Sequence, residues 1–276
     1  MVGGNLFDVA ACGAFPPGRV RLHWSGRPRE TTPELERLIA ETWERAAAEC
    51  SRRGAMLYDG AMLRWIGDRV VDGVLHIETG PTRYRDFVGT NLYNPHRLED
   101  FGRERFANPI GTTTTILSSD GWLVYGRRSH RVIYHAGYLH TFGGSLEEED
   151  VRSDGGVDPF SAVHRELAEE MRLDAEHIDG TICVGLVHER KIWQPELLFE
   201  TRVRLTRDEL VCRLDPGDVH QEHVSIECVP DEPDALVPFV RRSAPVAPVA
   251  IAAMCLHGRL RWGLDWFNAA MAVLNR

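Results

Sequence analysis

The chain has 276 residues and a net charge of −9 at pH 7, and 26% of its residues are charged. A chain of this length can bury one large core or two smaller ones, and the composition excludes a disordered or collagen-like protein. The acidic balance argues against a nucleic acid as the main partner.

The first third of the chain predicts a small α+β module that ends in a turn-rich junction at residues 81–109. A helix is expected to begin at Thr32 and to close at Gly54. Two alternating runs predict a hairpin that turns at Gly67 and Asp68. The expected strands of this module are residues 19–24, 62–66 and 70–77.

Beyond the junction, the pattern predicts strands, one acidic helix and two closing helices. Asp158 and Pro159 are a good start for the acidic helix, because they combine an N-cap acceptor with a proline in the first turn. We therefore expect an N-terminal module at 1–105 and a larger domain at 106–276. Its expected strands are 112–117, 122–127, 138–142, 181–188, 195–205 and 224–229, and its closing helices are 234–240 and a segment from 248 onward.

The acidic helix places Glu166, Glu169 and Glu170 at spacings of i, i+3 and i+4. This spacing gathers three carboxylates on one face, where like charges repel unless a cation joins them. The alternative to a metal site is an acidic helix face that is only exposed to solvent. Apolar residues repeat on the opposite side and give the helix a buried stripe. A divalent metal is therefore the favoured partner of the acidic face.

The order of strand, Asp-Gly turn, strand, glycine pair and acidic helix resembles the Nudix hydrolase family over about residues 109–260. The matching residues are Gly143-Gly144 and the run Arg165-Glu166-Leu167-Ala168-Glu169-Glu170. The resemblance implies a Nudix-type α/β/α sandwich. The N-terminal module and residues 84–91 are similar to the divergent branch that includes UDP-glucose and UDP-galactose pyrophosphatases.

The chain departs from the family motif in three ways. Arg165 lies 21 positions after Gly144, where the family has 14, so the loop carries about seven extra residues, which include an acidic run. Val157 stands where the family has its first glutamate, and Arg172 stands where it has a late glycine. We expect the role of that first glutamate to be absent or to be filled from the insertion.

The resemblance implies a catalytic set in which Mg2+, or Mn2+ in its place, is held by the three helix glutamates. The carbonyl of Gly144 could add a ligand, and Arg165 would orient Glu169. A carboxylate outside the motif can serve as base or as an extra ligand, and Glu189 is the candidate, although a solvated loop acid is an equal alternative.

Substrate binding is expected in two further segments, residues 84–91 and the basic stretch that begins at Arg127. Guanidinium groups match phosphate oxygens, but a solvated hairpin edge is the alternative for the arginines. For residues 84–91, the alternative is a structural junction between the two parts of the chain. His220 and His223 read as surface or packing residues rather than as a metal pair. The expected substrate-binding residues are Tyr84, Arg85, Asp86, Thr90, Asn91, Arg127 and Arg128.

The resemblance implies Mg2+-dependent hydrolysis of UDP-glucose or UDP-galactose to UMP and a hexose 1-phosphate. The alternatives are another nucleotide substrate, such as ADP-ribose, a dinucleotide or coenzyme A, and a non-catalytic nucleotide-binding module. The partner is thus a nucleotide-sugar small molecule. The sequence fixes neither the sugar nor the oligomeric state.

The six cysteines are scattered without a Cys-x-x-Cys pair, which is typical of reduced thiols in a cytoplasmic protein. The first twelve residues lack the basic region and long apolar core of a signal peptide. The apolar stretch at 246–255 contains proline and is too short to span a bilayer. We expect a cytoplasmic protein with no membrane partner.

Overall fold

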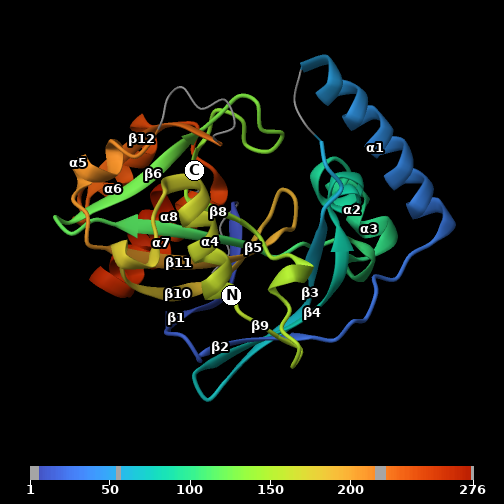
Figure 1. The fold of residues 1–276 in the computed structure, drawn as a ribbon, viewed down its shortest axis with the longest axis horizontal. Coiled ribbons are helices and arrows are strands. Elements are labelled where there is room, and N and C mark those ends of the chain that lie inside the picture. The colour runs from blue at the N-terminus through green and yellow to red at the C-terminus, as the bar shows by residue number, and fades with distance from the viewer. Residues whose placement is uncertain (1–5, 54–56, 215–221, 275–276) are drawn as a thin grey trace.

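A computed structural model describes residues 6–53, 57–214 and 222–274. It confirms the predicted α/β fold, with one eight-stranded and one four-stranded sheet (Figure 1). The path through the large sheet is β1-β10-β11-β5-β6-β12, with β7 paired to β6 and β8 paired to β5. The small sheet runs β3-β4-β2-β9.

The bounds of the strands and helices are as follows. The strands are β1 Phe7–Phe15, β2 Val20–Trp24, β3 Ala61–Val71, β4 Val74–Arg83, β5 Gly111–Leu117, β6 Trp122–Arg128, β7 Leu139–His140, β8 Phe142–Ser145, β9 Gly156–Val157, β10 Ile178–Glu189, β11 Pro195–Val203 and β12 His223–Pro230. The α-helices are α1 Pro33–Arg53, α2 Tyr84–Phe87, α3 Leu98–Phe101, α4 Pro159–Met171, α5 Arg207–Val211, α6 Leu236–Arg242, α7 Pro248–Trp262 and α8 Leu264–Leu274.

Helices cover both faces of the large sheet, which explains why its central strands β5 and β11 are buried on both sides. In β11, Leu197 and Phe199 belong to the core cluster that includes α4, whereas Leu198 belongs to the cluster that includes α7. Successive residues of a strand point to opposite faces, so this alternation places α4 and α7 on opposite sides of the sheet. Within the described residues, no helix is long and apolar enough to cross a bilayer.

The two halves of the chain each contribute a strand to the other sheet. β1 pairs antiparallel with β10 of the large sheet, although it comes from the first fifteen residues. In return, β9 of the glycine-to-helix loop pairs with β2 of the small sheet, with Val157 opposite Leu22. The division at residues 105 and 106 stays a prediction, and these two exchanges tie the predicted parts together.

The hairpin of the N-terminal module turns later than the sequence pattern indicated. β3 continues through Gly67, where its register with β4 shifts, and ends at Val71. The turn is made by Asp72 and Gly73, whose φ angles are 50° and 71°. Positive φ at both turn residues is the geometry that Asp-Gly favours in two-residue hairpins, and this pair outcompetes Gly67-Asp68.

A buried ionic contact joins α7 to the large sheet. The His257 side chain is 1% exposed, with Nδ1 2.7 Å from Glu200 Oε2 and Nε2 2.8 Å from Asp231 Oδ1. Burial opposes the charged imidazole, but the hydrogen bonds and charges of the two carboxylates outweigh it and raise the pKa of His257 above its ordinary 6.5. The imidazolium therefore stabilises the contact between α7 and β11.

We expect His257→Gln to lower the free energy of unfolding by about 2 kcal/mol near pH 6, because it breaks a buried ion pair. Each carboxylate would keep only an arginine partner that is more exposed, Arg202 for Glu200 and Arg261 for Asp231. The pKa is raised on folding, so the stabilisation is complete below 6.5 and is lost as the pH rises through the folded-state value. Urea unfolding between pH 6 and 9.5 measures the effect, with exposed His96→Gln as the control. If the free energies of unfolding of His257→Gln and the wild type differ by the same amount at every pH, this account is contradicted.

Candidate functional site

The acidic helix α4 is built by local signals at both ends. Asp158 caps its N-terminus by accepting hydrogen bonds from Phe160 N at 3.1 Å and Ser161 N at 3.3 Å, and Pro159 occupies the first turn. Arg172 ends the helix in the left-handed conformation, with φ 52° and ψ 40°, which a glycine would adopt at lower cost. The apolar stripe packs into the core, which fixes the acidic face toward β8.

The glycine pair lets the carboxylates of α4 approach β8. A Cβ on Gly143 would lie 2.0 Å from the carbonyl oxygen of Thr112, and its N–H donates to Glu170 Oε2 at 2.9 Å. A Cβ on Gly144 would lie 2.6 Å from Glu166 Oε1. Gly143 is therefore required by the close packing of β8 against the β5 backbone, whereas a side chain at residue 144 would displace the Glu166 carboxylate from its approach to β8.

A cavity of about 410 Å³ lies between the acidic face of α4, β8 and the N-terminal module. Its lining holds five glutamates but a single arginine, so it carries a strong negative charge. It also holds several aromatic rings from both halves of the chain. The lining residues are Tyr58, Gly60, Met62, Tyr84, Phe87, Thr112, Thr113, Arg128, Tyr134, His140, Gly143, Gly144, Ser145, Glu147, Glu166, Glu169, Gln194, Glu196 and Glu222.

Burial and like charges perturb the carboxyls of this cavity. The pKa of Glu166 is raised to about 7, first by burial and then by the charges of Glu170, Glu169 and Glu222, against the opposing effect of Arg165. A carboxyl at this pKa is half protonated at neutral pH, because burial and the neighbouring like charges outweigh the attraction of Arg165.

Two further glutamates show the same tendency. Burial, followed by the charge of Glu189, holds the pKa of Glu196 well above its ordinary range. Burial also raises the pKa of Glu147, with added repulsion from Asp150 and from Glu169, although Arg165 opposes it. The cavity therefore gathers carboxyl groups whose negative charge Arg128 and Arg165 neutralise only in part.

The donor set fits a magnesium ion. Carboxylate oxygens are its preferred ligands, and Glu166 and Glu169 present theirs to the cavity beside the Gly144 carbonyl. Within the described residues, no three carboxylate, imidazole or thiol side chains form a complete coordination set. Mg2+ does not need one, because it usually binds one or two carboxylates and keeps waters or substrate phosphates as its other ligands.

Glu170 lies behind the cavity rather than in its lining. One of its oxygens accepts from Gly143 N, and the other lies 3.3 Å from Nε2 of His223, which is 2% exposed. Its assigned metal role stays a prediction. His223 is a packing residue against Phe142, at 4.9 Å between ring centroids, and His220 lies outside the described residues.

Arg165 contacts the insertion, not Glu169. Its guanidinium reaches both oxygens of Asp150, at 2.5 and 3.5 Å, and lies 3.5 Å from Glu166 Oε1. The expected orientation of Glu169 by Arg165 therefore has no contact to support it. Asp150 belongs to the acidic run of the extended loop, so the insertion supplies a carboxylate to the motif arginine. That the insertion also fills the role of the missing first glutamate stays a prediction.

Val157 is a packing residue of the extended loop. It is 3% exposed and lies in the core cluster with Leu22, its partner across the β2–β9 pair. A glutamate at this position would bury an unpaired charge in the small sheet's core. The loop has thus exchanged the motif carboxylate for an anchor on the N-terminal module.

The predicted substrate arginines separate in the structure. Arg128 lines the cavity and pairs with Glu222 at 3.0 Å. Arg127 points elsewhere, with Nε 3.0 Å from Glu227 Oε1 and Nη2 donating to the carbonyl of Ser243 at 2.8 Å. Of these two arginines, only Arg128 therefore lines the cavity, and its binding of a phosphate stays a prediction.

The predicted segment at 84–91 mostly forms the junction between the halves. Of the five residues predicted here to bind substrate, only Tyr84 lines the cavity. Thr90 and Asn91 are fully buried, and Asn91 Nδ2 donates to the carbonyl of Ile192 at 2.9 Å. These contacts give no sign of substrate binding.

The remaining two predicted residues of that segment, Arg85 and Asp86, contact other residues of the N-terminal module. Arg85 N donates to Asp59 Oδ1 at 3.0 Å, and its Nε has no partner. Asp86 lies 3.7 Å from Arg29. Substrate binding by these residues stays a prediction without a contact to support it.

Glu189 is buried at the end of β10, with 2% exposure. Tyr134, which lines the cavity, donates its hydroxyl to Glu189 Oε2, and His135 Nε2 lies 3.6 Å from the same oxygen. Glu189 therefore reaches the cavity through Tyr134, and a solvated loop acid is excluded.

Sequence reasoning missed Glu196, Tyr134 and Glu222 as cavity residues. Glu196 stands within a strand and matches no motif. The structure pairs it with Gly111, where a Cβ would lie 1.9 Å from Glu196 Oε2. Tyr134 lies in an irregular segment that offers no pattern.

No family model matches the chain. It is 26% identical over 159 residues to the uridine diphosphate glucose pyrophosphatase NUDT22 of Mus musculus, covering 50% of this chain and 51% of that protein. It is 24% identical over 228 residues to the protein of the same name from Homo sapiens, covering 72% and 73%. These relatives confirm the resemblance to the UDP-glucose pyrophosphatase branch of the Nudix hydrolases, and the first match spans about half of its relative's length.

Solved structures of Nudix hydrolases are also similar. One from Nitrosomonas europaea has a TM-score of 0.35 and 15% sequence identity, with 57% of this chain and 93% of that chain covered.

We expect Glu166→Gln to stabilise the metal-free protein by about 2 to 3 kcal/mol at pH 8. The pKa of Glu166 is raised on folding to about 7, so its ionised form destabilises the fold above that pH, and the penalty fades as the pH falls toward 4.5. Urea unfolding in EDTA at pH 5 and 8 measures the difference, with exposed Glu44→Gln as the control. A Glu166→Gln protein that is less stable than wild type at pH 8 would refute the proposed repulsion.

Proposed function

We propose that the protein is a divalent-metal-dependent pyrophosphohydrolase that cleaves the diphosphate of a UDP-sugar, UDP-glucose or UDP-galactose, to UMP and a hexose 1-phosphate. The observation that carries the proposal is the glutamate-rich cavity that the glycine pair and α4 build around Glu166 and Glu169. The similarity to two UDP-glucose pyrophosphatases supports the substrate class.

A diphosphate cannot enter this cavity without cations, because five glutamates face a single arginine there. Glu166 and Glu169 would hold Mg2+, which supplies charge neutralisation for the diphosphate oxygens and activation of the attacking water. Binding of the cation would also relieve the repulsion that raises the pKa of Glu166. Mn2+ prefers the same oxygen ligands and could replace Mg2+.

The protein's own groups would orient the substrate. Arg128 is placed to meet a phosphate oxygen, and a guanidinium suits that contact. Gly143 N–H holds Glu170, and the Glu189 carboxylate holds the Tyr134 hydroxyl at the cavity. Tyr84 and Phe87 of the N-terminal module offer ring faces on which a base could stack.

The test is a panel of substrates incubated with Mg2+, comprising UDP-glucose, UDP-galactose, ADP-ribose, NADH and coenzyme A, with product identification. We expect UMP and hexose 1-phosphate from the UDP-sugars, and no turnover in EDTA. We further expect Glu169→Gln to reduce turnover about 100-fold or more, because even the residues behind a metal's ligands contribute about 10- to 100-fold.

Glu44→Gln on exposed α1 removes the same charge far from the cavity and serves as the matched control, with wild-type turnover expected. Circular dichroism establishes that each variant is folded. Cleavage of ADP-ribose, NADH or coenzyme A alone would reassign the substrate within the same chemistry. Inactivity on the whole panel, or near-normal turnover by Glu169→Gln, would sink the proposal and favour a non-catalytic nucleotide-binding module.

A further inference from the structure

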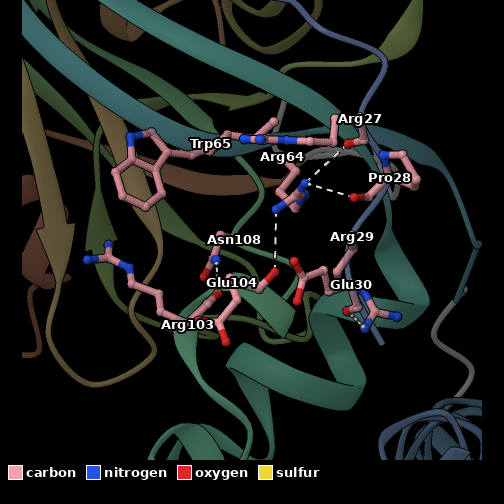
Figure 2. A pocket seen from close by; sticks show the side chains of 10 residues that line it. Arg27, Pro28, Arg29, Glu30, Arg64, Trp65, Arg103, Glu104 and Asn108 are labelled. Atoms are coloured by element: carbon pink, nitrogen blue, oxygen red, sulfur yellow. Dashed lines mark hydrogen bonds between the residues drawn. The ribbon is translucent and has the colours of Figure 1, made fainter. Parts of the chain in front are cut away.

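A second cavity has a volume of about 740 Å³, and Figure 2 shows the side chains that line it. It shares no lining residue with the glutamate-rich cavity. It lies against β3, between the segment that leads into α1 and the segment that follows α3. Its polar lining is dominated by arginine, so the two cavities have opposite charge. The lining residues are Arg27, Pro28, Arg29, Glu30, Arg64, Trp65, Ile66, Arg103, Glu104 and Asn108.

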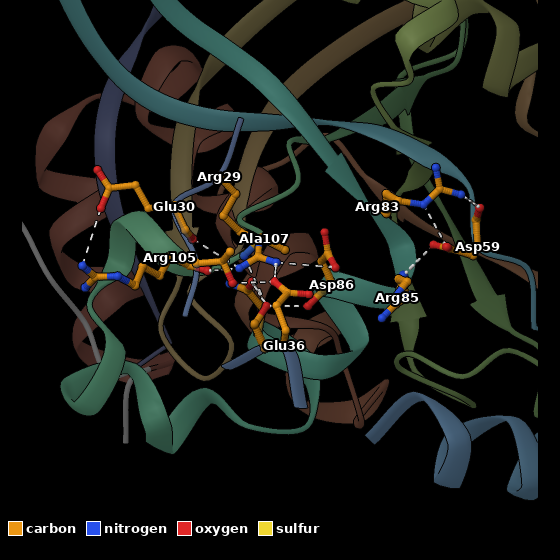
Figure 3. A network of polar contacts seen from close by, with 12 residues as sticks. Arg29, Glu30, Glu36, Asp59, Arg83, Arg85, Asp86, Arg105 and Ala107 are labelled. Atoms are coloured by element: carbon orange, nitrogen blue, oxygen red, sulfur yellow. Dashed lines mark hydrogen bonds and ion pairs between the residues drawn. The ribbon is translucent and has the colours of Figure 1, made fainter. Parts of the chain in front are cut away.

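Part of this positive charge is neutralised by carboxylates outside the cavity. Arg29 lies 2.6 Å from Glu36 and 3.7 Å from Asp86, which together compensate it (Figure 3). Arg27, on the exposed rim, lies 3.3 Å from Glu78. These two arginines therefore have partners.

The two acidic residues of the lining are likewise engaged elsewhere. Glu30 lies 3.5 Å from Arg105, and Glu104 lies 3.1 Å from the same guanidinium. Arg105 is not part of the lining. The cavity's own acids are therefore already paired with a cation from outside it.

Arg64 and Arg103 remain, and among the described residues no carboxylate lies within ion-pair distance of either. Arg64 is 4% exposed and donates from Nη2 to the carbonyls of Arg27 at 3.1 Å and Pro28 at 3.2 Å. These are neutral acceptors, and its buried Nε has no partner. Arg64 thus carries a buried charge without a counter-ion.

Arg103 is held in place by neutral rings. Its guanidinium carbon lies 4.5 Å from the centroid of Trp65, and Nη2 lies 2.6 Å from His188 Nδ1. Its buried Nε has no partner. Asp68 accepts a hydrogen bond from Trp65 Nε1 at 3.0 Å and acts on Arg103 only from a longer distance.

A buried guanidinium group at Arg64 and a partly buried one at Arg103, both without a counter-ion, are costly unless an anion completes them. Burial is the main cause that lowers the pKa of both Arg64 and Arg103, which agrees with this geometry. The two unmatched charges add up to the charge of a phosphate monoester, whereas a single carboxylate would match only one.

We infer that this cavity is a binding site for a dianionic phosphate monoester, with Arg103 as its main contact and Arg64 as the second positive charge. A guanidinium fork matches phosphate oxygens geometrically, and the cavity volume is typical of small-molecule sites. Exposed Arg27 and Glu30 at the rim leave the site open to solvent. The ligand could be a nucleoside monophosphate, a sugar phosphate or inorganic phosphate.

Isothermal titration calorimetry with UMP, glucose 1-phosphate and inorganic phosphate separates these sources. The titrations are made in EDTA, so that no metal can recruit a phosphate to the glutamate-rich cavity and the result does not depend on the proposed hydrolysis. We expect one site per chain for at least one probe. Arg103→Gln should weaken its binding about tenfold or more, because a hydrogen bond to a charged group is lost.

Arg21→Gln removes an exposed charge from β2, outside this cavity, and should bind like the wild type. Arg103→Lys, which keeps the charge but loses the fork, should give intermediate affinity and replaces Arg103→Gln if that variant fails to fold. Failure of all three probes to bind at about 10 mM, well above weak millimolar affinity, would overturn the inference. Binding that the Arg103 variants leave unchanged would overturn it as well.

Discussion

Glu166, Glu169 and Glu170 are held next to one another although their charges repel, and this forced proximity is the constraint around which the site is built. The apolar stripe of α4 fixes the helix on the large sheet. Gly144 carries no Cβ that would displace the Glu166 carboxylate, and Gly143 N–H donates to Glu170. Burial and these like charges raise the pKa of Glu166, so its ionised form lowers the stability of the fold. Such a loss is expected where a fold prepares a site for a cation.

The N-terminal module bears on this constraint through the loop that leads into α4. The pairing of β9 with β2 anchors the loop immediately before Asp158 caps the helix. Within the same loop, Asp150 engages Arg165. The extra residues of the loop therefore connect the helix to the small sheet, and Val157 serves packing where the family motif carries a glutamate.

The two cavities differ in whether their arginines are paired with carboxylates. Arg128 faces the glutamate-rich cavity and is paired with Glu222, whereas Arg64 and Arg103 face a cavity in which no carboxylate of the described residues pairs with them. One cavity lacks positive charge and the other lacks negative charge. A metal ion would complete the first, and a phosphate would complete the second.

The sequence predicted α4, its N-cap and its acidic face, because these depend on spacings within one helix. It also indicated most strands of the large sheet. It did not predict the exchange of β1 and β9, since strand pairing across more than a hundred residues leaves no local pattern. Glu196 and Tyr134 were missed for the same reason: they join the cavity through the sheet's register and a loop path. The turn at Asp72 was misplaced because two Gly and Asp pairs competed.

The central claim is that the glutamate-rich cavity is a divalent cation site. Anomalous diffraction from crystals of the protein soaked in Mn2+ tests it most directly. The account predicts a manganese peak in contact with the carboxylates of Glu166 and Glu169. Manganese bound only elsewhere, with no peak in this cavity, would contradict it.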